Sequence, residues 1–220
     1  MHTSPPPGLW DSFWAEHASS EQLFHRLLWR IRHVFSYAYA ISLVRGSRSQ
    51  SAGRILEVGS GSARTLHYLC MKLPQSQGFV LDLAPEALKI VRRISPGFLP
   101  TGGDALDLPF AAKAFQATFS IGLIEHFDRV LAARIVREMV RVTEPRGLVA
   151  VMVPWQSSFY NLVRLVFGRH WPFGHEQPFR RAELGRFMLS QGLTEVHVRV
   201  IYVSTLLAIG YRLDSMPELP

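Results

Sequence analysis

The chain has 220 residues, of which 48% are hydrophobic and 19% are charged, a composition typical of one folded domain and not of a disordered chain. Its formal net charge is +7, and 21 of its 24 basic residues are arginine, which raises the expectation of a nucleic acid or an anionic membrane as partner. The arginines are spread along the chain without a run of four, so we interpret them as a solvated face. The single cysteine, Cys70, excludes an intramolecular disulfide and a multi-cysteine metal site.

Residues 1–45 are predicted to form an N-terminal tail followed by covering helices. Residues 9–44 carry apolar side chains at helical spacing with arginines between them, and Ser19-Ser20 followed by Glu21 predicts a break between two helices. We expect these helices to cover the sheet of the main domain. A basic, aromatic helix can also lie on a membrane surface, so peripheral membrane contact is the alternative.

Two features of the sequence bear on its compartment. The N-terminus lacks the basic-then-apolar pattern of a secretion signal. The longest uncharged apolar run, residues 200–211, is shorter than the ~20 residues that a membrane-spanning helix needs. We therefore expect a cytoplasmic protein.

Residues 54–66 predict a buried strand, a glycine turn and the start of a helix. Glu57 lies at the end of the strand, and Gly59 and Gly61 allow the backbone to bend tightly and to approach a ligand without a Cβ in the way. The first turn of the following helix offers unpaired N–H groups to a polar ligand. The segment is therefore a candidate binding loop for a nucleotide-like molecule.

The third small residue of this turn separates two kinds of binding loop. The dinucleotide turn G-x-G-x-x-G would place a third glycine at position 64, where this chain has Arg64. The spacing here is E-x-G-x-G-x-A, with Ala63 as the third small residue. This pattern disfavours an oxidoreductase that uses NAD.

A second strand is predicted over residues 78–83, and it ends in Asp82, twenty-one positions after Gly61. A carboxylate at that place can accept hydrogen bonds from ribose hydroxyls. Pro85 suits the first turn of the helix that follows. Capping of this helix is therefore the alternative role for Asp82.

Two further fragments complete the pattern. Residues 103–110 read G-D-A-L-D-L-P-F after a short strand at 98–102, and residues 117–127 are a buried strand that runs into a loop. With E-x-G-x-G-x-A and Asp82, these fragments follow the order and spacing of class I S-adenosylmethionine-dependent methyltransferases. The chain resembles this family over roughly residues 50–155, and it is similar to the type 11 group of small-molecule methyltransferases.

The resemblance implies S-adenosylmethionine as the cofactor and suggests which residues contact it. In the family, the Asp of the G-D-x-x-x-L-P-F run takes the exocyclic amine of adenine, the next backbone N–H reaches the ring, and the fourth strand passes the methionine part. The residues that it assigns to the cofactor are Glu57, Gly59, Ser60, Gly61, Asp82, Leu83, Asp104, Ala105 and Ile121.

The remaining elements complete the predicted fold. An amphipathic helix is expected over 128–143 with Val130 in its buried stripe, a fifth strand within 144–154, a sixth at 192–200 and a seventh at 205–212. The fold class is α/β, a Rossmann-like, doubly wound and mostly parallel sheet of about seven strands with the last one antiparallel. Residues 46–220 form the methyltransferase domain, with a lid insertion at 155–179.

The insertion is rich in aromatic residues and is predicted to form the acceptor site. In class I methyltransferases the loop after the fifth strand helps to form that site, and aromatic walls suit an apolar or planar acceptor enclosed from water. Trp155, Tyr160 and Trp171 are the candidate acceptor residues. Packing into a small core beneath the loop is the alternative for several of the aromatics.

Methyl transfer is an in-line displacement in which the enzyme mainly supplies alignment and desolvation. A base can be needed to take a proton from an oxygen, nitrogen or acidic carbon acceptor. His126, just after the fourth strand, and His175, in the insertion, are the candidates. Capping or packing at a helix start is the alternative role for His126, and no metal is expected.

The predicted function is S-adenosylmethionine-dependent methyl transfer to a small, apolar or planar acceptor. The net charge alone suggests an RNA methyltransferase, but Ile121-Gly-Leu-Ile124 stands where an Asn-Pro-Pro-aromatic motif would serve amino groups of bases. A non-catalytic accessory protein that binds S-adenosylmethionine is the third alternative, and the intact glycine motif counts against it. The acceptor atom and the oligomeric state stay open.

Overall fold

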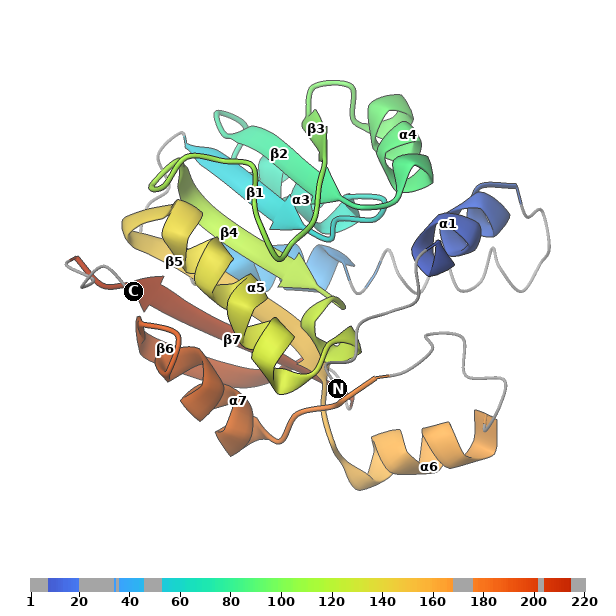
Figure 1. Cartoon of the computed structure of the whole chain (residues 1–220), viewed down its shortest axis with the longest axis vertical. Coiled ribbons are helices and arrows are strands. Elements are labelled where there is room, and N and C mark those ends of the chain that lie inside the picture. The colour runs from blue at the N-terminus through green and yellow to red at the C-terminus, as the bar shows by residue number, and fades with distance from the viewer. Residues whose placement is uncertain are drawn as a thin grey trace.

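The computed structural model describes residues 8–19, 34, 36–45, 53–167, 176–201 and 204–214. Within these ranges the chain forms one seven-stranded sheet with helices on both faces (Figure 1). The strands are β1 (Arg54–Val58), β2 (Gln77–Asp82), β3 (Leu99–Gly102), β4 (Phe115–Ile121), β5 (Thr143–Pro154), β6 (Leu193–Ile201) and β7 (Thr205–Arg212).

The strand order is β3-β2-β1-β4-β5-β7-β6. The pairs β1–β2, β2–β3, β1–β4 and β4–β5 are parallel, and β7 is antiparallel to both β5 and β6. The predicted Rossmann-like sheet with an antiparallel last strand is therefore confirmed. The order reverses between β1 and β4, and open α/β sheets bind ligands outside the carboxyl ends of the strands at such a point.

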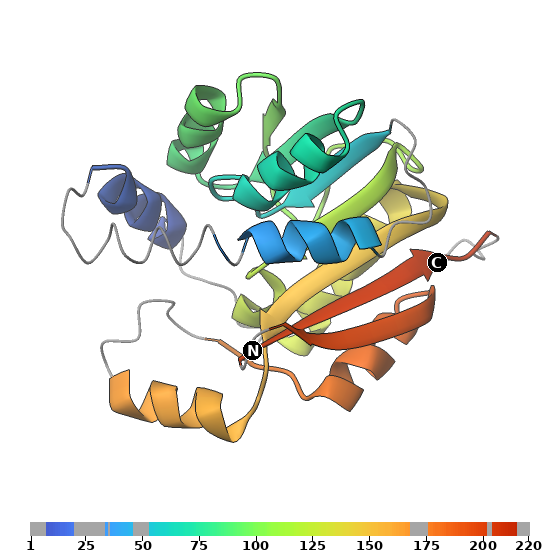
Figure 2. The same ribbon diagram turned by 180° about the vertical axis from the view of Figure 1, so that it is seen from behind.

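The helices divide between the two faces of the sheet, as Figures 1 and 2 show from opposite sides. One core cluster joins the sheet to α5 and α7, and a second joins its other face to α3, α4 and the helical residues 36–45. Besides residues 36–45, the helices in the described ranges are α1 (Leu9–Ser19), α3 (Arg64–Lys72), α4 (Pro85–Ile94), the short 3-10 helix η1 (Ile124–His126), α5 (Arg129–Val142), α6 (Ser158–Phe167) and α7 (Arg181–Leu189).

Helix α5 begins where a good capping residue stands. The Asp128 carboxylate accepts hydrogen bonds from the backbone N–H groups of Val130 and Leu131, both at 2.9 Å, which satisfies two donors of the first turn. The predicted helix is confirmed, but the prediction that Val130 joins its buried stripe is wrong, because that side chain is 57% exposed. Val130 lies in the first turn, ahead of the buried positions that begin at Ala132.

The N-terminal segment is described in two parts. Helix α1 is described up to Ser19, and residues 20–33 lie outside the described part of the chain, so the break predicted at Ser19-Ser20 stays a prediction. Trp14 of α1 packs with Ala87 and Ile90 of α4, while Ala40 and Leu43 of the 36–45 helix join the core beneath the sheet. The division into segments 1–45 and 46–220 stays a prediction.

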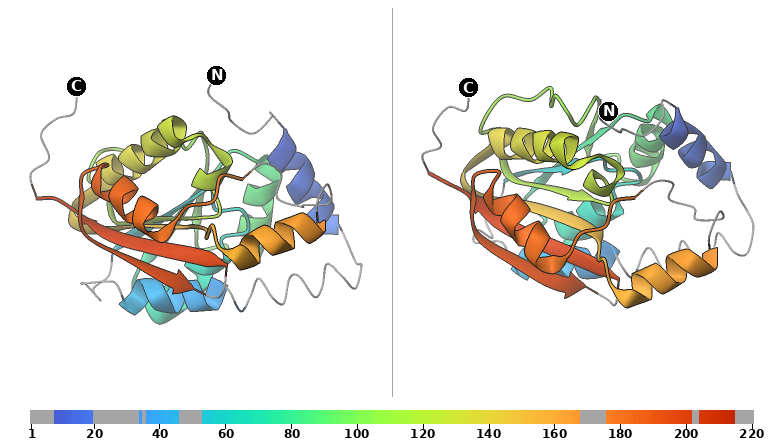
Figure 3. Two further views of the ribbon diagram at one scale, coloured as in Figure 1. Left: turned by 90° about the horizontal axis from the view of Figure 1, so that it is seen from below. Right: turned by 60° about the horizontal axis from the view of Figure 1, so that its bottom comes forward.

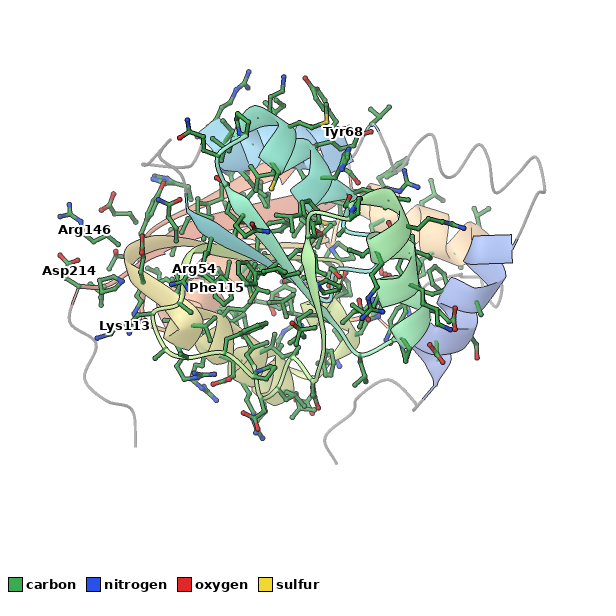
Figure 4. The ribbon with its side chains drawn as sticks, turned by 90° about the horizontal axis from the view of Figure 1, so that it is seen from above. Arg54, Tyr68, Lys113, Phe115, Arg146 and Asp214 are labelled. Carbon is green, nitrogen blue, oxygen red and sulfur yellow. The ribbon has the colours of Figure 1, made fainter. Side chains whose placement is uncertain are left out.

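Helices α1 and α6 both lie beyond one end of the sheet (Figure 3). Figure 4 shows Arg146 and Asp214 at the opposite end of the molecule, where Nε of Arg146 is 4.0 Å from Oδ1 of Asp214. Arg146 stands near the start of β5, so α1 and α6 are at the carboxyl edge. Of the helices in the described ranges, none is both long and apolar enough to cross a membrane.

Candidate active site

The glycine turn connects β1 to α3 through an unusual backbone. Gly59, Gly61 and Ala63 all have positive φ angles, of 64°, 50° and 51°, a region that glycine enters without strain. The N–H groups of Gly59 and Ser60 both donate to the carbonyl of Leu81, at 2.8 and 3.1 Å. A Cβ at Gly61 would overlap the ring of Trp14. The turn is thus fixed against β2 and leaves room for only the smallest residue.

Glu57 supports this turn from behind. Its side chain is 3% exposed, and Oε2 accepts a hydrogen bond from the backbone N–H of Leu66 at 3.2 Å. Leu66 belongs to α3, so the carboxylate ties the strand to the helix after the turn. Glu57 does not line the cavity described below. Its position therefore does not favour direct contact with a ligand.

Asp82 joins the turn to the end of β2. Its Oδ2 accepts from the backbone N–H of Gly61 at 2.7 Å, and Oδ1 accepts from that of Ala84 at 2.9 Å. Burial raises the pKa of this carboxyl, and the backbone hydrogen bonds oppose that change. The predicted capping alternative holds only indirectly. Ala84, not Asp82, is the N-cap residue of α4, and Asp82 accepts a hydrogen bond from the backbone N–H of that residue.

The loop after β3 brings Asp104 and Ala105 to the same edge. Oδ1 of Asp104 accepts from the backbone N–H of Leu106 at 2.9 Å, which closes a short turn. Asp104 is exposed, whereas Ala105 beside it is buried. The carboxylate is thus held at the rim, with one acidic side chain available to a ligand that enters from solvent.

A cavity of about 800 Å³ collects these segments at the carboxyl edge. Eight of the nine residues that the sequence analysis assigns to the cofactor line it, and Glu57 is the exception. They are Gly59, Ser60, Gly61, Asp82, Leu83, Asp104, Ala105 and Ile121. A second hollow, of about 550 Å³, lies over α7 and β6 and contains none of the predicted residues.

Aromatic side chains from distant parts of the chain enclose the rest of the cavity. They come from α1, from the helix over 36–45, from the loop after η1 and from α6. These residues are Trp10, Phe13, Trp14, Tyr39, Phe127, Phe159 and Tyr160. A wall of this kind suits a molecule that is apolar or planar over much of its surface.

The predicted acceptor residues take different places. Tyr160 lines the cavity, whereas Trp155 does not and instead packs, partly buried, against the core cluster on the α5 and α7 face of the sheet. This matches the packing alternative for Trp155. Trp171 and His175 lie outside the described residues.

Three titratable side chains meet in the cavity, and the sequence analysis named only one of them. Ligand atoms of Glu125, His126 and Glu176 all lie within 4.8 Å of one another, and all three side chains are buried. The His126 ring centroid is 4.7 Å from that of Trp10. Burial, and after it the charge of Glu176, raises the pKa of Glu125 well above its usual value.

Glu176 is held by a second hydrogen-bonded layer. The hydroxyl of Tyr160 donates to its Oε2 at 2.7 Å, and Nη1 of Arg164 donates to the Tyr160 oxygen and to the Glu176 carbonyl, both at 3.2 Å. Burial raises the pKa of Tyr160 above its usual value, and its hydrogen bond to Glu176 acts in the same direction. Tyr160 is therefore a hydrogen-bond donor near neutral pH.

Comparison with known proteins gives a family for the central part of the chain. Residues 55–147 match the family model described as a methyltransferase domain. These residues run from β1 into β5 and include every segment that brings a predicted cofactor residue to the cavity.

Two curated proteins show similarity to the chain. Malonyl-(acyl-carrier protein) O-methyltransferase of Methylococcus capsulatus is 26% identical over 163 residues, which cover 71% of this chain and 58% of that protein. "Probable tRNA methyltransferase 9B" of Mus musculus is 32% identical over 102 residues, which cover 37% of this chain and 22% of that protein. The chain thus spans less than two thirds of either relative.

Solved structures share the fold at low sequence identity. A chain from the complex between the Haloferax volcanii Trm112 methyltransferase activator and a methyltransferase superposes with a TM-score of 0.69 and 17% identity, over 92% of this chain and 98% of that one. The S-adenosylmethionine-dependent methyltransferase SibL gives 0.70 and 20% over 91% of this chain and 62% of that one. The match over residues 55–147 identifies a methyltransferase domain in the central part of the chain, and the sheet order and these structures show that the chain has the fold of class I methyltransferases.

Proposed function

We propose that the protein transfers a methyl group from S-adenosylmethionine to a small, apolar or planar acceptor. The observation that carries this proposal is a single cavity that joins the strand-end loops of the methyltransferase domain to an aromatic wall. A donor and an acceptor held in one enclosed space can be aligned for in-line displacement.

The loops at the strand ends fit the cofactor. Gly59 and Gly61 keep the backbone of the turn open to a ligand, and Oγ of Ser60 is buried without a hydrogen-bond partner in the described structure. Buried hydroxyls normally have a partner, so a ligand polar group suits this place. We expect Asp82 to hold the ribose and Asp104 with Ala105 to hold the adenine.

S-adenosylmethionine, when bound, supplies the methyl group together with its own leaving group. The residues of this chain would then orient the acceptor, exclude water and, where the acceptor carries a proton, accept it. His126 lines the cavity and keeps its proposed role as base. Glu125 is a second candidate, because a carboxyl whose pKa is raised well above its usual value is better matched to proton transfer near neutral pH.

An RNA acceptor is the alternative that the net charge and the name of the mouse relative suggest. The cavity argues against it, since Glu125 and Glu176 lie buried within it and a polyanion is recognised through positive charge. The name of the Methylococcus relative specifies a malonyl group linked to an acyl-carrier protein. The methyl acceptor named there is a carboxylate oxygen, so acceptors with an oxygen nucleophile are among those to test.

The test is an incubation of the protein with S-adenosylmethionine labelled in its methyl group and with a cell extract separated into small molecules, RNA and protein. We expect label in the small-molecule fraction, followed by identification of the product by mass spectrometry. Label in RNA alone would overturn the proposal in favour of the alternative. Cofactor binding by calorimetry without label in any fraction would favour the non-catalytic accessory role.

A further inference from the structure

The cluster of Glu125, His126 and Glu176 has the composition of a cation site. Two carboxylates and one imidazole each offer a ligand atom, and these atoms lie within 4.8 Å of one another. Atoms bound to one ion at about 2.1 Å stand roughly 3 to 4.2 Å apart, so small side-chain rotations would bring the three atoms onto a common centre. Glu125 and His126 come from η1, whereas Glu176 lies fifty residues later in the chain.

One carboxylate oxygen of the cluster has no hydrogen-bond partner in the described structure. Oε2 of Glu125 is buried and accepts no hydrogen bond, while the whole side chain is only 2% exposed and lines the cavity. A buried acceptor without a partner is costly and calls for an explanation such as an ion. The atom is therefore an independent sign that a ligand belongs there.

Neighbouring side chains contact the other two residues of the cluster. The hydroxyl of Tyr160 donates to Oε2 of Glu176 at 2.7 Å, and the ring of Trp10 lies against that of His126. Hydrogen bonds of this outer kind fix the position of a ligating carboxylate. The Glu176 carboxylate is thus held near the other two residues, and only small rotations are needed for the three side chains to bind one ion.

We propose that Glu125, His126 and Glu176 bind one first-row divalent cation, of the Mn²⁺ or Zn²⁺ type, inside the cavity. The ion would offset the charges of two buried carboxylates that are costly to ionise side by side. The imidazole favours a first-row transition cation over Mg²⁺ or Ca²⁺, which prefer oxygen ligands alone. This site differs from our expectation of a chain without a metal, and it does not depend on the proposed methyl transfer. While an ion is bound, the ligand atoms of His126 and Glu125 are occupied and do not act as proton acceptors.

The experiment is a Mn²⁺ titration of the full chain followed by electron paramagnetic resonance, in which bound Mn²⁺ loses the sharp six-line signal of the free ion. We expect one saturable site per chain that Zn²⁺ displaces. Glu125→Gln and Glu176→Gln should each weaken binding by at least roughly tenfold, since even outer partners of metal ligands are worth about 10- to 100-fold. Tyr160→Phe should weaken binding by a smaller factor.

Glu86→Gln is the matched control, because this surface carboxylate on α4 pairs with Lys89 at 2.5 Å and lies outside the cavity. Far-UV circular dichroism confirms the fold of each variant, and Glu176→Gln carries the test if Glu125→Gln does not fold. Absence of saturable Mn²⁺ or Zn²⁺ binding by the folded wild-type chain at about 1 mM, the weak end of protein cation sites, would overturn the proposal. Binding that survives in both glutamine variants would overturn it as well.

Discussion

The residues that line the two halves of the cavity are distributed differently along the chain. The strand-end half consists of the loops after β1, β2 and β3, which all fall within residues 59–106, together with Ile121 at the end of β4. The helical half takes its side chains from α1, from the helix over 36–45, from η1 with the residue after it and from α6 with Glu176. Short sequence motifs describe the first half, and only the folded chain assembles the second.

The two halves also differ in what holds them. Backbone hydrogen bonds tie the strand-end half together, as between Gly59 and Leu81 at 2.8 Å and between Gly103 and Asp82 at 3.1 Å. Side-chain contacts hold the helical half, as between Tyr160 and Glu176. Substitutions in the first half should therefore disturb cofactor binding, and substitutions in the second should disturb acceptor or ion binding.

The largest effect is expected where the halves touch. Gly61→Ala places a Cβ against the Trp14 ring of α1 and puts a non-glycine residue at a φ of 50°. Strain of this kind costs about 1–3 kcal/mol, to which the overlap adds, so we expect S-adenosylhomocysteine binding to weaken by roughly a hundredfold. Isothermal calorimetry measures this loss.

Gly97→Ala is the matched control, because a Cβ at Gly97 meets nothing within 4 Å. The double variant Gly61→Ala with Trp14→Ala should recover part of the lost affinity if the overlap with the ring is a cause. Equal affinities of Gly61→Ala and the wild-type chain would show that the turn does not approach the cofactor.

Asp82→Ala should have the next largest effect. It removes the acceptor that bonds Gly61 N–H at 2.7 Å and that we propose for the ribose hydroxyls. Hydrogen bonds to a charged group are worth about 1.5–3 kcal/mol, so cofactor affinity should fall by at least roughly tenfold while the melting curve keeps its cooperative form. If the dissociation constant does not change, the role left for Asp82 is its hydrogen bond from Ala84 at the start of α4. Asp107→Ala serves as the control, because Asp107 is an exposed carboxylate of the next loop.

The sequence predicted the strand-end half well because each motif is local. Gly59, Asp82 and Asp104 each lie at the end of a strand or within two residues after it, and parallel strands bring such ends to one edge. Glu57 shows the limit of this reasoning, since alternation along a strand turned its side chain toward α3. The motif spacing gives the residue type without the direction in which the side chain points.

The helical half was predicted less completely because its contacts join distant residues. Tyr160 was found through the aromatic content of the insertion, but Glu125 and Glu176 were not singled out, although each stands next to a predicted histidine. Their pairing depends on how the segment after α6 returns to η1, as in the hydrogen bond from Gln177 N–H to the Glu125 carbonyl at 2.7 Å. No local periodicity encodes that return.

Glu125→Gln should make the fold more stable at higher pH. Burial raises the folded-state pKa of Glu125 well above its usual value, so the wild-type chain loses stability as pH rises from the unfolded pKa toward the folded one. Glutamine does not titrate, and the advantage of the variant should grow by about 1.4 kcal/mol for each unit of pKa difference. Urea unfolding at pH 5 and pH 8, both with a chelator, measures the change.

Glu138→Gln provides a control of opposite sign. Partial burial acts to raise the pKa of Glu138, but hydrogen bonds from Arg141 and Leu108 lower it overall. Its contribution to stability is therefore present above the unfolded pKa and is lost as pH falls, so the glutamine variant should be the less stable chain at pH 8. A gain in stability for Glu125→Gln that is equal at both pH values would contradict the raised pKa.

The smallest effect is expected for Tyr160→Phe, which removes one hydroxyl and leaves the ring in the aromatic wall. The lost donor bonds Glu176 at 2.7 Å, and a hydrogen bond to a charged partner is worth about 1.5–3 kcal/mol before the site relaxes. Arg164 lies 3.2 Å from the hydroxyl and can turn toward the carboxylate, so we expect only a several-fold rise in acceptor KM. The dissociation constant for S-adenosylhomocysteine should stay unchanged, because Tyr160 belongs to the helical half.

Leu165→Ala, a 78% exposed position on the same helix, should alter neither the acceptor KM nor the dissociation constant. A variant that loses cofactor affinity as much as acceptor affinity would show that the two halves are not separate, and Glu176 would then belong to the site of the cofactor.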